Sequence, residues 1–316
     1  MTDLRLVIGL NAVLTALSGR SPRVLCLSRS VGWGLPFGAF DPARHRTFEL
    51  GMREFVEQQA DVPLGYVEQL YTFGDMGRES PRAFMRDSVP TDRVVSVGYL
   101  GLAAEPAPPA IERASWIDWY VYFPWEDWRE GRPRCLDKDI LCPLKDWAHT
   151  DERRQRLRAA FGLDGVPWEE ERVLDRYELL YEAHLVAEAA RDKEGTLPEN
   201  PDSATGRMML SDHRRILATA IGRLRGKLRY RPIIFQMMPD AFTLTDLQIA
   251  VEAILGFDIH KQNFRRSLEA AGLVEKTGGL AAATGGRPAA LYRASALARQ
   301  KHASGMTLPR LRFSIA

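Results

Sequence analysis

The sequence lacks a long apolar run. None of its 316 residues fall in a stretch of about 18 uncharged apolar residues, the length that a bilayer-spanning helix needs. The uncharged run Leu6–Gly19 is shorter, and the positive start and the small-residue cleavage site of a signal peptide are poorly formed around it. We therefore expect a first helix or strand there, and a cytoplasmic protein.

Cysteine is also scarce. The three cysteines, Cys26, Cys135 and Cys142, are odd in number and follow no recurring spacing. Together with His149, the last two could suggest a metal site, but the spacing matches no common zinc arrangement and a fourth ligand is not evident. We expect ordinary free thiols.

Charge is unevenly distributed along the chain, although the net charge is only +2. Residues 203–316 contain 18 Lys and Arg against 7 Asp and Glu, and residues 1–202 contain 25 against 34. A basic C-terminal part predicts contact with a polyanion, whereas the alternative is internal docking between oppositely charged halves. Composition alone does not separate these two interpretations.

The two halves meet in a segment, residues 192–206, that is rich in Gly, Pro, Ser, Asn and acidic residues, as in a linker or long loop. The first half has a mixed α/β pattern. We predict strands over 23–29, 66–73, 94–102 and 116–125, and helices over 48–59 and 169–193.

The second half predicts a winged helix-turn-helix. Ser211 and Asp212 can cap a helix that runs to about Lys227, Thr245 can cap a second helix that ends at Gly256, and a short basic helix ends at Gly272. A hairpin with a glycine-rich tip follows. In the basic helix, Phe264 and Leu268 are spaced to face inward. The candidate DNA-contacting residues are Lys261, Gln262, Asn263, Arg265, Arg266, Lys276 and, in the wing, Arg287. The basic residues between 214 and 231 are expected to add phosphate-neutralising charge. The alternative is a solvated cationic helix without a nucleic-acid partner.

The first half carries an incomplete metal-binding pattern. A Leu-Pro-x-Gly turn at Leu35–Gly38 precedes Arg-Glu-x-x-Glu-Gln at Arg53–Gln58, close to the Arg-Glu-x-x-Glu-Glu signature of Nudix hydrolases. In that signature, carboxylates at i, i+3 and i+4 share one helix face and bind Mg²⁺. Gln58 replaces one carboxylate, and Ala60 and His45 replace the expected glycine and glutamate. This helix predicts a site without the full set of metal ligands.

The whole chain resembles the bacterial Nudix-related transcriptional regulators of NAD metabolism. The strongest stretch is Asp240–Arg293, and "YVEQLYTFGD", "RVVSVGYL" and "SDHRRILATAIGRLRGKLRY" also match. The incomplete Nudix motif and the tryptophan-rich insertion at about 104–202 resemble the branch that represses de novo NAD synthesis genes. The resemblance implies an α+β fold, with a Nudix-like α/β/α sandwich over 1–202 and a winged helix-turn-helix over 203–316. It also implies a homodimeric repressor on a palindromic DNA operator, with ATP, NAD or ADP-ribose as effector, with or without Mg²⁺.

The resemblance further implies a binding site without turnover, with no catalytic or metal-binding residues and no required cofactor. The candidate ligand-binding residues are Arg29, Phe37, Arg53, Glu54, Glu57, Tyr71, Phe73 and Trp119. Arg53 could instead pair with a nearby carboxylate, and each aromatic residue could instead pack in the core. The rival from another class is an active Nudix pyrophosphatase on ADP-ribose-like nucleotides with an accessory nucleic-acid module. A third interpretation is an interaction scaffold with a basic tail.

Overall fold

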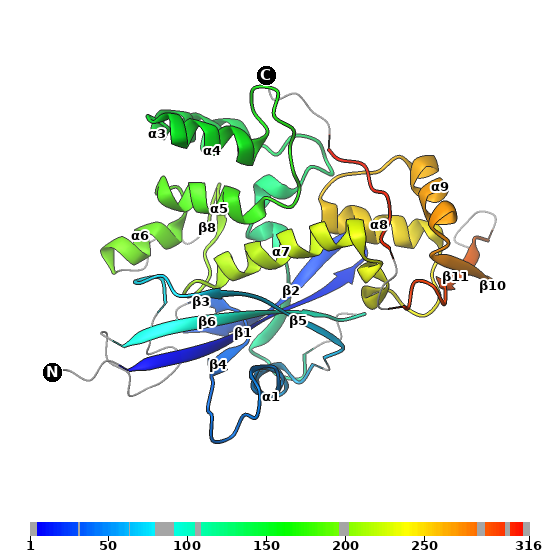
Figure 1. Ribbon diagram of the computed structural model, residues 1–316, viewed down its shortest axis with the longest axis horizontal. Coiled ribbons are helices and arrows are strands. Elements are labelled where there is room, and N and C mark those ends of the chain that lie inside the picture. Colours follow the sequence, from blue (N-terminus) through cyan, green and yellow to red (C-terminus); the bar gives the residue numbers. More distant parts are fainter. Residues whose placement is uncertain are drawn as a thin grey trace.

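A mixed β-sheet lies at the centre of the protein (Figure 1). The computed structural model describes residues 5–30, 32–62, 64–79, 92–104, 109–195, 202–282, 288–300 and 304–311. The strands of the sheet are β1 Leu6–Ser18, β2 Ser21–Arg29, β3 Gly32–Gly34, β4 Phe37–Ala39, β5 Tyr66–Phe73, β6 Arg93–Leu102 and β7 Ala114–Asp118. The order is β3-β2-β1-β6-β5, with β4 paired to β1 and β7 to β2. Only the β1–β6 pair is parallel within this described sheet.

One face of the sheet is covered by helix α1, Phe48–Ala60. Thr47 caps this helix, because its side chain accepts a hydrogen bond from the Leu50 N–H at 3.2 Å. The buried residues Met52, Val56 and Ala60 recur every four positions, so they share the helix face that packs on the sheet. The predicted helix over 48–59 is therefore confirmed.

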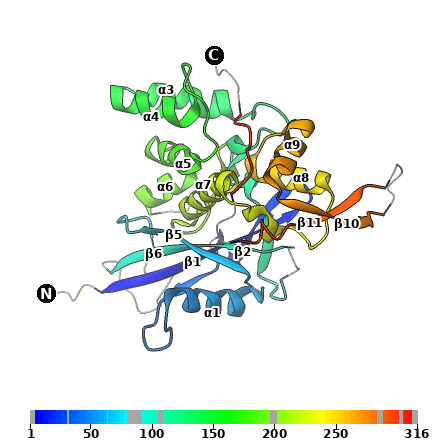
Figure 2. The same cartoon turned by 45° about the vertical axis from the view of Figure 1, so that its right-hand side comes forward.

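The opposite face is covered by α7, His213–Tyr230, as Figures 1 and 2 both show. Its buried residues Ile216, Ala220 and Leu224 point at the sheet, as their spacing predicted. Contact is close, since a Cβ atom added at Gly98 of β6 would lie 3.1 Å from the Ile216 side chain. Helix, sheet and helix thus form the expected α/β/α sandwich. α7 ends at Tyr230, three residues beyond the predicted end.

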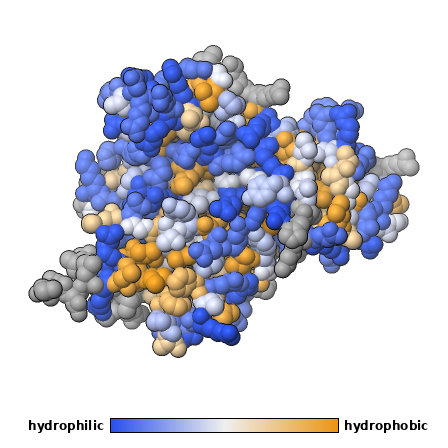
Figure 3. All heavy atoms as spheres, viewed as in Figure 1, coloured by the Kyte–Doolittle hydropathy of each residue, from blue (hydrophilic) through white to orange (hydrophobic). Residues whose placement is uncertain are grey.

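The tryptophan-rich insertion forms a helical layer above α7 (Figure 1). It contains a π-helical turn at Leu136–Leu141 and the helices α3 Cys142–Trp147, α4 Asp151–Phe161, α5 Val173–Glu182 and α6 Ala187–Glu194, followed by the short strands β8 Asp202–Ser203 and β9 Gly206–Arg207. The surface over α3 and α4 is mostly hydrophilic, whereas apolar residues gather near β1 and β6 (Figure 3).

Two predictions for the insertion are wrong. The expected strand over 116–125 ends at Asp118, where the Asp118 carboxylate accepts from the Tyr120 N–H at 2.8 Å and starts a 3-10 turn, Trp119–Val121. A second 3-10 turn, Pro124–Glu126, follows, because proline offers no N–H to a β-ladder. The expected helix over 169–193 is two helices, since the chain turns at His184, where φ is +56°.

A buried carboxylate connects this insertion to the rest of the chain. Glu126 accepts hydrogen bonds from Arg176 of α5 at 2.5 and 3.1 Å and from Arg225 of α7 at 2.5 Å. All three side chains are at most 1% exposed. Arg225 also donates to the Ile254 carbonyl at 2.9 Å, and Tyr120 donates to the Ala253 carbonyl at 2.8 Å. These two carbonyls lie at the end of the next helix, α8, Leu244–Leu255. The end of α8 is therefore held by the insertion and by α7.

The C-terminal part has the predicted order of two helices and a hairpin. α8 is Leu244–Leu255, α9 is Lys261–Ala271, and β10 Val274–Leu280 pairs antiparallel with β11 Ala290–Ala294. Gly256 and Gly272 end the helices in the left-handed conformation, as expected. The N-cap of α8 is Thr243 rather than Thr245, because Thr243 and Asp246 form a reciprocal capping box.

The cap expected for α7 also differs. Asp212 precedes this helix but makes no capping hydrogen bond, and Ser211 lies outside the helix with φ at +47°. In the described part of the chain, no helix is long and apolar enough to span a membrane. The three cysteines are unpaired, as expected.

Candidate nucleic-acid interface and nucleotide pocket

The turn between α8 and α9 is held by one buried carboxylate. Glu252, 6% exposed near the end of α8, accepts from the Ile259 N–H and from the Gln248 side chain, both at 2.8 Å. Gln248 also donates to the Ile259 carbonyl at 2.9 Å. These bonds satisfy the backbone of the turn and set the angle at which α9 leaves α8.

Helix α9 buries one face and exposes donors on the other. Phe264 and Leu268 pack inward, as predicted, and are 2% and 0% exposed. The exposed residues are Lys261, Gln262, Asn263 and Arg266, whereas Arg265 is half-buried. Arg266 donates to the Asn263 side-chain oxygen at 2.7 Å, which pre-orders two of these groups. Such amide and guanidinium donors can contact base edges and phosphates.

The wing presents one of its two candidate cations within the described residues. Lys276 is exposed on β10, but Arg293 on β11 pairs with Glu275 at 3.0 Å. The candidate Arg287 lies outside the described residues.

The cations of α7 do not serve a phosphate backbone. Arg214 pairs with Glu188 at 3.1 Å, and Arg229 pairs with Glu170 at 2.8 Å. Arg215, Arg223, Arg225 and Lys227 also pair with carboxylates of residues 68–212. The prediction of phosphate-neutralising charge here is wrong, because these side chains dock α7 on the acidic part of the chain. Internal docking accounts for this share of the charge asymmetry.

A pocket of about 590 Å³ lies between α1 and β4. It is lined by Arg29, Phe37, Gly38, Ala39, Phe40, Asp41, Pro42, Arg44, His45, Phe55 and Gln59. Gln59 sets the shape of one wall, because its side chain donates to the Phe37 carbonyl at 2.7 Å and accepts from the Phe37 N–H at 3.2 Å. The backbone of β4 is thereby clamped to α1.

The pocket carries unneutralised positive charge. Arg29 is within 3.5 Å of the Gln59 carbonyl oxygen and lies 5.2 Å from the Phe37 ring centre, but within the described chain it has no carboxylate partner. Burial and the nearby Arg113 lower the pKa of Arg29, as expected for a cation that lacks a counter-charge. An anionic ligand would supply that charge.

The pocket is also connected to the start of α7. Phe37 packs edge-on against His213 at 5.0 Å, and His213 Nδ1 accepts from the Leu35 N–H at 3.0 Å. Burial lowers the pKa of His213 to about 3, with smaller effects from Arg191 and Arg29. His213 is therefore neutral at physiological pH and acts as a fixed acceptor.

The α1 carboxylates do not fit a magnesium site. Glu54 pairs with Arg44 at 2.5 Å, lies 3.3 Å from His45 Nε2, and accepts from the Gln58 side chain at 2.8 Å. Glu57 is exposed. Magnesium needs near-octahedral oxygen ligands with negative charge, whereas here the best-placed carboxylate, Glu54, is paired with Arg44. Among the described residues, no group of three His, Cys, Asp or Glu is placed to hold a metal ion.

The predicted ligand residues separate into two groups. Arg29 and Phe37 line the pocket, and Glu54 borders it through Arg44 and His45. Five others do not line it, and one of these, Glu57, is exposed on α1. Arg53 pairs with Glu49 at 2.9 Å and donates to the Leu64 carbonyl, Tyr71 is exposed, and Phe73 and Trp119 are buried in the core. For Phe73 and Trp119 the structure therefore matches the core-packing alternative, and for Arg53 the carboxylate alternative.

Sequence reasoning missed Gln59 and Arg44. A signal for Gln59 was present, because it follows Phe55 by four residues and so shares its helix face. For Arg44, the local sequence gave no comparable signal, since its contact with Glu54 depends on how the loop folds back.

Comparisons with known proteins agree with this two-part organisation. Residues 234–294 match the family described as the NrtR DNA-binding winged helix domain. Over 82 residues the chain is 45% identical to the ADPR responsive transcriptional repressor NtrR of Acinetobacter baylyi, a match that covers 26% of this chain and 32% of that protein. The chain thus spans about a third of the length of that curated relative.

Solved structures show the same fold over the whole chain. Shewanella oneidensis NrtR, also solved with a 27mer DNA, is similar with a TM-score of 0.54 and 21% identity, covering 96% of this chain and 99% of that one. A MutT/nudix family protein from Enterococcus faecalis has a TM-score of 0.52 and 17% identity, covering 93% of this chain and 88% of that one.

The fold is thus that of a Nudix-like domain joined to a C-terminal winged helix domain. Residues 234–294 thus match the NrtR winged helix, and the fold of the chain is similar to that of NrtR.

Proposed function

We propose that this protein is a DNA-binding transcriptional repressor that senses an adenine nucleotide, with NAD biosynthesis genes as its targets. The observation that carries the proposal is the exposed donor face of α9, within a domain that matches the NrtR winged helix. Gln262, Asn263 and Arg266 share this face, Arg265 lies at its edge, and Lys261 is exposed at the first position of the helix. Two copies would place two such helices on a palindromic operator about one helical turn apart.

The effector would bind in the pocket of Arg29, Phe37 and Gln59. The A. baylyi relative is named for its response to ADPR, which makes ADP-ribose the first effector to test here, before NAD and ATP. Arg29 supplies an uncompensated cation for a pyrophosphate, while Glu54 is occupied by Arg44. We therefore propose binding without hydrolysis and without a required metal.

A route from this pocket to α9 follows from described contacts. Phe37 contacts His213 at the start of α7, and Arg225 further along α7 donates to the carbonyl at the end of α8. A ligand that moves Phe37 would bias the placement of the winged helix. The effect on DNA requires different ligand affinities in the free and DNA-bound forms.

The proposal is tested by fluorescence anisotropy on the upstream region of an NAD-synthesis operon from the same genome, with and without ADP-ribose, NAD or ATP. We expect specific binding that one nucleotide changes by about 5- to 150-fold. Specific binding that none of the nucleotides alters would refute the sensor role, and binding that does not discriminate this region from unrelated duplex would refute the repressor role.

Loss of cations on α9 is expected to weaken operator binding. Lys261→Ala combined with Arg266→Ala should reduce affinity by at least tenfold and lower the salt slope by about two. Arg134→Ala is a matched control, because Arg134 is exposed and far along the chain from α9, in the insertion. Equal affinities of the double variant and the control would exclude α9 as the DNA-binding helix.

Arg29→Ala should weaken binding of ADP-ribose by about 10- to 100-fold, the usual effect of losing a hydrogen bond to a charged group. The measurement is isothermal titration calorimetry, with Arg134→Ala again as control. A Mg²⁺-dependent hydrolysis assay on ADP-ribose, which follows the formation of AMP and ribose 5-phosphate, accompanies it. Clear turnover that Glu54→Gln abolishes would establish the pyrophosphatase alternative instead.

A further inference from the structure

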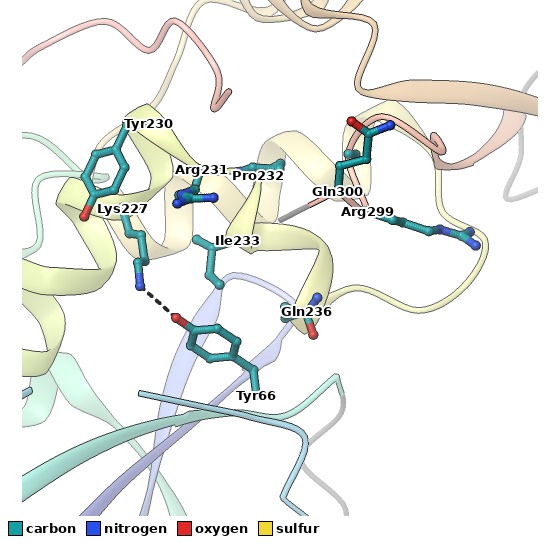
Figure 4. Close-up of a pocket in the computed structure, with 10 residues that line it drawn as sticks. Tyr66, Lys227, Tyr230, Arg231, Pro232, Ile233, Gln236, Arg299 and Gln300 are labelled. Atoms are coloured by element: carbon teal, nitrogen blue, oxygen red, sulfur yellow. Dashed lines mark hydrogen bonds between the residues drawn. The ribbon is translucent and has the colours of Figure 1, made fainter. Parts of the chain in front are cut away.

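A second pocket, of about 450 Å³, lies where the sheet meets the connection to the winged helix (Figure 4). Tyr66 of β5 forms its floor, and Lys227 and Tyr230 at the end of α7 form one side. The connection Arg231–Ile233 and the segment Ala298–Gln300, which follows the wing, complete the walls. Three parts of the chain that are distant in sequence therefore enclose one space.

The charge of this pocket has one sign. Its lining includes Lys227, Arg231 and Arg299 but no carboxylate. Lys227 is already occupied, because it pairs with Glu68 and donates to the Tyr66 hydroxyl at 2.7 Å. Within the described chain, the side chains of Arg231 and Arg299 have no ion pair and no hydrogen bond. The Arg231 guanidinium is thus available to an anion, whereas Arg299 points away from it (Figure 4), and guanidinium geometry favours phosphate and carboxylate oxygens.

The remaining lining suits a flat ring. Tyr230 is 54% exposed, which is unusual for a large aromatic side chain beside a concave surface. Pro232, Ile233 and Ala298 supply apolar contacts, and the amides of Gln236 and Gln300 supply both donors and acceptors. Pockets of a few hundred cubic ångströms with mostly apolar walls and a few polar groups are typical of small-molecule sites.

We propose that this junction pocket binds a small phosphorylated aromatic metabolite of mononucleotide size. Arg231 would hold the phosphate, and the neighbouring Tyr230 would stack on the ring. The site is separate from the pocket of Arg29 and Phe37 and shares no lining residue with it. The proposal does not depend on the identity of the effector in that first pocket.

The test uses the full-length chain and AMP as the probe, measured by equilibrium dialysis or calorimetry. The parent for this experiment is the Arg29→Ala variant, so that the first pocket contributes little. We expect AMP to bind this parent with a Kd below about 1 mM. Adding Arg231→Ala should weaken binding by about tenfold or more, and adding Tyr230→Ala by several-fold. Adding Arg134→Ala should change nothing.

Three results would overturn the proposal. The first is no AMP binding to the Arg29→Ala parent, and the second is AMP binding that Arg231→Ala and Tyr230→Ala leave unchanged. The third is a loss of duplex DNA binding in these two variants with AMP affinity unaltered, which would assign the guanidinium groups to the DNA backbone. Inorganic phosphate is a further arm: it should compete much more weakly than AMP, and equal competition would exclude recognition of the ring. If Arg231→Ala unfolds the chain, Arg231→Gln, which keeps most of the side-chain volume and removes the charge, replaces it.

Discussion

Replacing Glu126 with glutamine is expected to lower the free energy of unfolding by about 3–5 kcal/mol. The substitution preserves shape but leaves Arg176 and Arg225 buried without a counter-charge. Desolvating an unpaired guanidinium costs more than the pair itself contributes, so the loss exceeds that of a surface pair. Urea unfolding followed by circular dichroism measures it.

Asp137→Asn is the matched control, because Asp137 pairs with Arg132 at 2.5 Å on the surface and is 61% exposed. Its expected cost is below about 1 kcal/mol. Equal losses in the two variants would contradict the role assigned to burial.

The difference between wild type and Glu126→Gln should also depend on pH. Burial alone raises the pKa of Glu126, but Arg176 and Arg225 outweigh burial and hold it below its usual value. A carboxylate with a lowered folded-state pKa stabilises the fold above its unfolded pKa, about 4.3, and loses that contribution as pH falls. The two proteins should therefore converge in stability below about pH 4.

The second large effect is expected for Gly256→Ala. Gly256 has φ +83°, and a Cβ atom there would lie 2.3 Å from the Glu126 carbonyl oxygen and 2.8 Å from the Tyr120 hydroxyl. Either the end of α8 or the turn at Glu126 must move. We expect a loss of about 3 kcal/mol or more, from left-handed strain together with the clash.

Gly272→Ala separates those two causes. Gly272 ends α9 with φ +61°, but the nearest atom to an added Cβ is Leu297 Cδ2 at 3.8 Å. This variant carries only the conformational cost, about 1–2 kcal/mol. Thermal unfolding of both variants compares them, and a Gly272→Ala loss as large as that of Gly256→Ala would show that the close contact has no effect.

The elements that local pattern determines were predictable. Strand β5 and helix α1 have clear periodicity, and α9 combines a Phe264–Leu268 face with a terminal glycine. The strand expected over 116–125 failed because its aromatic residues suit a buried strand and a buried turn equally well. There, the Asp118 cap and Pro124 decide the outcome. The expected helix over 169–193 is interrupted at His184. The interruption is visible only in the positive φ angle of that residue.

The site was predictable to a smaller extent. Arg29 and Phe37 line the pocket because they flank the Leu-Pro-x-Gly turn, a local feature. Trp119 lies elsewhere because its burial depends on contacts distant in sequence, whereas Arg53 is held by Glu49 one helical turn away. The same limit explains α7, whose cations resemble a DNA-binding stripe until their carboxylate partners are placed beside them.

Helix α7 also determines how separable the two halves are. A break near residue 203 was predicted from composition, yet α7 beyond it forms a layer of the sandwich, and its Arg225 reaches the end of α8. Cutting the chain at that break would remove one layer of the sandwich from the Nudix-like domain. It would leave the winged helix domain attached to α7, whose apolar residues and arginines would have no surface to cover. The contacts of α7 therefore join residues 213–230 to the sheet as well as to the end of α8. An exchange of the winged helix domain for another DNA-binding domain would preserve the Nudix-like domain only if the junction fell after Tyr230, the last residue of α7. The match to the winged helix family begins shortly afterwards, at residue 234.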